Sequence, residues 1–186
     1  LLDRPITFFD DRGSGTPTDA LEPIASEAQQ RGYEVRFCDD ITEPAGIGFY
    51  AEHVEATPEV NAELSVITFH GIDDVYNTEF WVHEPWGMFD IGLLPGEFAA
   101  KNWQKMSWLD VVPRFGVFDV GWPKSDHVFS DEFESTVHRR EGSLGIEDGS
   151  TAIYAPTIEN DRKMSRFVDA AGGVFDNLLV KHAPYD

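Results

Sequence analysis

The sequence has few cysteines, few basic side chains and no long apolar run, and each shortage excludes a class of protein. The single cysteine, Cys38, excludes an internal disulfide framework and a cysteine-rich zinc site. Only 14 Lys and Arg residues are scattered among 34 Asp and Glu residues, so the clustered positive charge of nucleic-acid-binding proteins is missing. No apolar run approaches the roughly 20 residues that cross a bilayer. We therefore expect a soluble protein that binds no nucleic acid.

The residues that are present suffice for a folded protein with an acidic surface. Of the 186 residues, 41% are hydrophobic and 13% are aromatic, enough for one sizeable core. The net charge of −20 is spread along the whole chain. An acidic tail or a cation-binding surface would cluster this charge, whereas a spread acidic surface keeps a protein hydrated in concentrated salt. The composition therefore predicts a halophilic protein.

Short apolar segments bounded by Gly, Pro or Asp predict the strands of a parallel sheet. Between the first two, Thr16-Pro17-Thr18-Asp19 opens a helix that runs to about Gln30, which gives the strand–helix–strand order of a parallel pair. A second crossover helix is expected from Gly96 to about Trp108. The predicted strands are residues 6–9, 33–38, 64–69, 89–94 and 115–120.

The pattern changes after these strands. Residues 127–150 mix charges and glycines with little periodicity, which predicts a linker. A strand at 151–154, a helix at 161–171 and a strand at 178–181 then begin a new unit. We expect residues 1–145 to form a Rossmann-like α/β domain flanked by helices. Residues 146–186 would be the incomplete beginning of a second such domain, which makes the chain a fragment of a longer protein.

His70 is the strongest candidate for a catalytic base. It follows a predicted parallel strand and precedes Gly71, so it lies where open α/β sheets bind their ligands. Imidazole titrates near neutral pH and can accept a proton from a hydroxyl nucleophile. A structural histidine at a strand end is the alternative. Glu79 and His83 are spaced like two metal ligands but have no third partner, so we expect no metal site.

Five motifs, most of them at predicted strand ends, occur in a recognisable order between residues 60 and 186. They are Thr68-Phe69-His70-Gly71, Leu94-Pro95-Gly96, Gly121-Trp122-Pro123-Lys124-Ser125-Asp126, Tyr154-Ala155-Pro156-Thr157 and Val180-Lys181-His182-Ala183-Pro184. This series resembles the CDP-glycerol glycerophosphotransferase family, whose members build teichoic-acid polymers of the cell envelope. The resemblance implies a GT-B architecture, in which two Rossmann-like domains face a cleft. The amino-terminal domain would hold the acceptor, and the carboxy-terminal domain the nucleotide donor.

The resemblance also implies roles for individual residues. His70 would deprotonate an acceptor hydroxyl, which would attack the glycerol-bearing phosphorus of a CDP-activated donor. The remaining substrate-binding residues would be Gly71, Gly121, Pro123, Lys124 and Asp126 in the cleft, with Lys181 and His182 at the donor diphosphate. No cofactor is implied. The protein would act in the cytoplasm, where the resemblance allows peripheral association with the inner face of the membrane. The fragment alone would be inactive.

Departures from the family pattern keep other functions open. Ala183 stands where the family has a second histidine, and Asp73 and Asp74 replace a cation. One alternative is a nucleotide-sugar glycosyltransferase or a UDP-sugar epimerase of the same architecture. Another is a non-catalytic glycan-binding or structural module derived from that fold.

Overall fold

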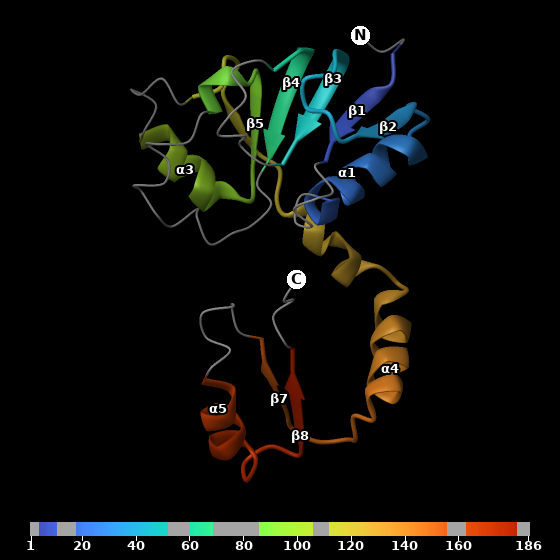
Figure 1. The fold of residues 1–186 in the computed structure, drawn as a ribbon, viewed down its shortest axis with the longest axis vertical. Helices are drawn as coiled ribbons and strands as arrows, with labels where there is room; N and C mark the ends of the chain where they lie inside the picture. The colour runs from blue at the N-terminus through green and yellow to red at the C-terminus, as the bar shows by residue number, and fades with distance from the viewer. Residues whose placement is uncertain are drawn as a thin grey trace. The chain divides into compact units, whose positions relative to one another are not determined.

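The protein divides into two compact units. The computed structural model describes residues 4–10, 18–51, 60–68, 86–105, 112–155 and 163–181. Contacts within the chain separate Leu1–Phe129 from Ser130–Asp186 (Figure 1). The boundary expected at residue 145 falls at the carboxyl end of a helix, Phe133–Leu144 (α4), which belongs to the second unit.

A six-stranded parallel sheet forms the centre of the first unit. Its strand order is β2-β1-β3-β4-β5-β6, and every neighbouring pair is parallel. The predicted α/β class with a parallel sheet is therefore confirmed. The strands are β1 (Ile6–Phe9), β2 (Val35–Cys38), β3 (Ala45–Tyr50), β4 (Ala62–Thr68), β5 (Ile91–Leu94) and β6 (Val117–Asp119).

The helix α1 (Thr18–Gln30) covers one face of this sheet. Successive side chains of a strand point to opposite faces, so Ile6 and Phe8 of β1 lie on the same side. Both pack with Leu21 of α1 in one buried cluster. Phe8 also stacks on Phe49 of β3, with ring centroids 4.9 Å apart. Apolar burial therefore fixes α1 against β1 and its neighbours.

The other face is covered by a 3-10 helix, η2 (Trp86–Met88), and by α3 (Glu97–Lys105). The predicted crossover between β5 and β6 is this α3 helix. Trp86 and Trp103 contact each other with ring centroids 4.7 Å apart, and both are almost fully buried. Phe9 of β1 stacks on Tyr50 of β3 in the same cluster. The two tryptophans are the largest side chains of this core.

The sequence analysis did not predict β3. Its sequence Ala-Gly-Ile-Gly-Phe-Tyr contains two glycines, which are unfavourable in strands. The structure gives a reason for Gly48. A Cβ atom there would lie 2.9 Å from each of Ala62, Phe9 and Tyr50, so the Phe9–Tyr50 stack needs a residue without a side chain.

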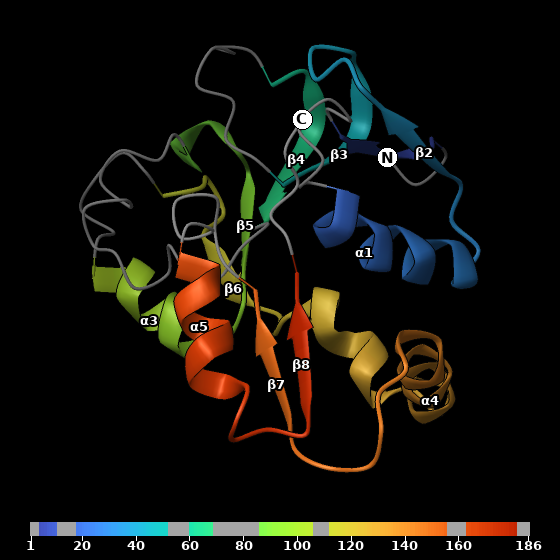
Figure 2. The same ribbon diagram turned by 60° about the horizontal axis from the view of Figure 1, so that its bottom comes forward.

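The second unit contains α4, β7 (Thr151–Tyr154), α5 (Met164–Ala171) and β8 (Asn177–Val180). Figure 2 shows β7 and β8 side by side, with α5 against them. This strand–helix–strand order was predicted. Residues 127–150 were expected to form a linker, and the structure places α4 in the middle of that range. No side chain of α4 is buried, so the helix lacks the apolar periodicity by which an amphipathic helix is recognised.

A serine–aspartate pair joins neighbouring strands in each unit. In the first unit, the Ser65 N–H and hydroxyl donate to one Asp90 carboxylate oxygen over 2.9 and 3.0 Å. In the second unit, Ser150 donates in the same way to Asp176, over 2.8 Å for both bonds. These bonds lower the pKa of the Asp176 carboxyl. They hold β7 and β8 in register at the end opposite to the predicted site.

Candidate functional site

The carboxyl ends of the six strands share one edge of the first sheet. All pairs are parallel, and open α/β sheets bind ligands beyond this edge. Thr68, the last residue of β4, is buried there. In the sequence, His70 and Gly71 come two and three residues after Thr68. Both lie outside the described residues, as do His182, Glu79 and His83.

The predicted turn at Gly121–Asp126 has a defined backbone. Gly121 adopts a φ of 75°, a left-handed conformation that favours glycine, and its N–H donates to Asp119 over 3.2 Å. The chain then enters a 3-10 helix, η3 (Pro123–Phe129), rather than a simple turn. One continuous segment, residues 121–126, therefore holds four of the predicted substrate-binding residues: Gly121, Pro123, Lys124 and Asp126. This segment packs against α1.

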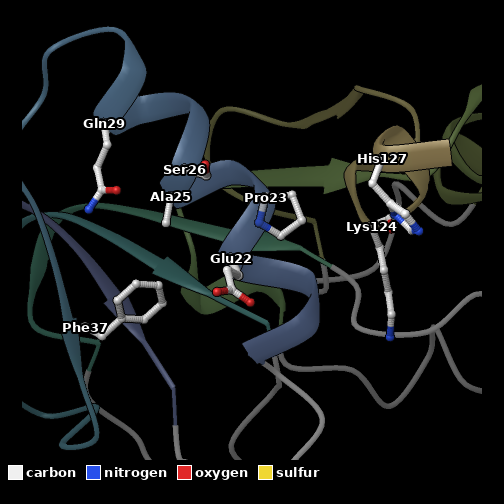
Figure 3. A pocket seen from close by; sticks show the side chains of 8 residues that line it. All are labelled: Glu22, Pro23, Ala25, Ser26, Gln29, Phe37, Lys124 and His127. Atoms are coloured by element: carbon white, nitrogen blue, oxygen red, sulfur yellow. Dashed lines mark hydrogen bonds between the residues drawn. The ribbon is translucent and has the colours of Figure 1, made fainter. Parts of the chain in front are cut away.

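A pocket of about 630 Å³ lies between α1 and η3. We call it the α1–η3 pocket, and Figure 3 shows its side chains. Its lining residues are Glu22, Pro23, Ala25, Ser26 and Gln29 of α1, Phe37 of β2, and Lys124 and His127 of η3. Of the residues predicted for substrate binding, Lys124 lines this pocket.

His127 is a pocket residue that the sequence analysis missed. In a 3-10 helix, side chains three positions apart lie on the same side, so Lys124 and His127 face the pocket together. The His127 Nδ1 atom lies 3.1 Å from the Lys124 carbonyl oxygen. A carbonyl can only accept, so Nδ1 carries a proton and donates. In the neutral ring, Nε2 is then the acceptor nitrogen. The sequence signal for His127 was its three-residue spacing from Lys124. This spacing places the two side chains on one side only if the segment is a 3-10 helix, which the sequence did not predict.

The second unit brings two motifs together at the carboxyl ends of β7 and β8. Tyr154 and Val180, the last residues of these strands, are paired in register. The next residue, Lys181, donates its backbone N–H to the Tyr154 carbonyl over 2.8 Å and is exposed. The ring of Tyr154 stacks on Phe167 of α5, with centroids 4.7 Å apart. The backbone hydrogen bond holds Lys181 beside Tyr154.

Within the described part of the chain, no three His, Cys, Asp or Glu side chains gather in a way that could hold a metal ion. None of the described helices combines the length and the apolar character that a membrane span requires. Comparisons with protein-family models, curated proteins and solved structures give no match.

Proposed function

We propose that this chain belongs to a GT-B transferase of the kind that its motif order resembles. The enzyme moves glycerol phosphate, or a related polyol or sugar phosphate, from a CDP-activated donor to a hydroxyl of a polymer or glycan. The observation that supports the proposal most is the register of β7 and β8. It places Lys181 beside Tyr154, although 26 residues separate them in the sequence. Tyr154 and Lys181 belong to two of the motifs that resemble the family. Both therefore lie at the carboxyl ends of β7 and β8, the edge at which α/β sheets bind ligands.

The proposed reaction uses one base and local positive charge. His70 accepts the proton of the acceptor hydroxyl. The oxygen of that hydroxyl forms a bond to the glycerol-bearing phosphorus, while the bond from this phosphorus to the bridging oxygen breaks and CMP leaves. Proteins assist such transfers mainly by positioning the reactants and neutralising their charge. Lys181 supplies this charge at the diphosphate.

The overall charge makes such local cations necessary. A chain of net charge −20 repels a nucleotide diphosphate. Only five residues of the chain are lysines. Lys124 and Lys181 each follow the end of a parallel strand, so they counteract this repulsion at the edges where ligands are expected. The site is proposed to act in the cytoplasm, at or near the inner face of the membrane.

Isothermal titration of the full-length protein with CDP-glycerol and with UDP-glucose tests the donor. We expect saturable binding of CDP-glycerol and about tenfold weaker binding after Lys181→Gln, the loss of one charge-assisted contact. Lys163→Gln is the matched control, because it removes a lysine of the same unit at the amino end of α5. Preference for UDP-glucose would point instead to a nucleotide-sugar enzyme. Absence of binding to either nucleotide would favour the non-catalytic module.

A further inference from the structure

We draw no further inference here: the strongest candidate, the surface patch of exposed apolar side chains at the edge strand β6 (Phe115, Phe118 and Val120), carries none because nothing in the described part of the chain shows what covers it.

Discussion

Tyr50 carries a polar group into the core of the first unit. It ends β3, its side chain is only 3% exposed, and its ring contacts those of Phe9 and Phe89 at 4.6 and 5.3 Å between centroids. Among the described residues, its hydroxyl has no hydrogen-bond partner. Burial, with a smaller contribution from the Cys38 thiol, raises the pKa of Tyr50. The ring thus contributes packing, while the buried hydroxyl costs free energy.

We therefore expect Tyr50→Phe to leave the free energy of unfolding unchanged or to raise it by up to about 1 kcal/mol, since it removes an unsatisfied polar group. Tyr50→Ala, which also removes the ring, should lower it by about 3–5 kcal/mol. Urea denaturation of the three proteins measures both differences. A loss of more than about 1 kcal/mol in Tyr50→Phe would mean that the hydroxyl has a partner.

At the scale of elements, a serine–aspartate pair helps to hold β7 and β8 in register at their amino ends. The Ser150–Asp176 pair joins the residues that precede β7 and β8. The pKa of Asp176 is lowered first by the Ser150 backbone N–H and then by the Ser150 hydroxyl. Because the folded-state pKa is below the unfolded-state pKa, ionised Asp176 contributes stability above the unfolded-state pKa. That contribution is lost as pH falls through the folded-state pKa.

Ser150→Ala removes the hydroxyl but keeps the backbone donor. We expect the pKa of Asp176 to rise only part of the way to its ordinary value, and the acid-induced loss of stability assigned to this residue to become smaller. An NMR titration of the Asp176 side-chain carbon measures the pKa. Ser143→Ala is the control, because the Ser143 hydroxyl donates within α4 to the Arg140 carbonyl. An unchanged pKa in Ser150→Ala would contradict this account of the pair.

The elements that sequence reasoning located are those whose apolar residues form a recognisable pattern in the sequence. β1 is buried at every position and three of its four residues are apolar, whereas β3 is interrupted by two glycines and α4 has no buried side chain. Gly48 is explained only by the Phe9–Tyr50 stack above it, which is a contact between strands. The same limit applies to the pocket. Lys124 was singled out by its motif, but its position near Ser26 depends on packing between segments about a hundred residues apart.

At the scale of the molecule, the net charge of −20 dominates the electrostatics. Some basic side chains pair with acids on the surface, such as Arg31 with Glu27 and Lys101 with Glu97, both at 2.6 Å. Exposed pairs of this kind contribute about 1 kcal/mol or less each. Because 34 acidic side chains face only 14 basic ones, we expect repulsion among the acids to outweigh these pairs and salt to screen that repulsion.

We expect the melting temperature to rise as NaCl is increased from about 0.1 M to about 1 M, because the Debye length falls from about 10 Å to about 3 Å. Differential scanning calorimetry measures this rise. Near the isoelectric point of about 4.4 the net charge is small, so the rise there should be smaller. A melting temperature that is flat or falls with salt at neutral pH would exclude screening of self-repulsion as a source of stability.

His70 is proposed to be the base of a phosphoryl transfer. The most direct measurement is CMP release from CDP-glycerol by the full-length protein, with a poly(glycerol phosphate) acceptor present. We predict CMP release by the unmodified protein and a rate about 10²–10⁴-fold lower in His70→Ala, the usual contribution of a general base. His138→Ala, an exposed histidine of α4 that lies 3.2 Å from Glu141, should retain the full rate. Release of CMP by His70→Ala at the unmodified rate would contradict the account.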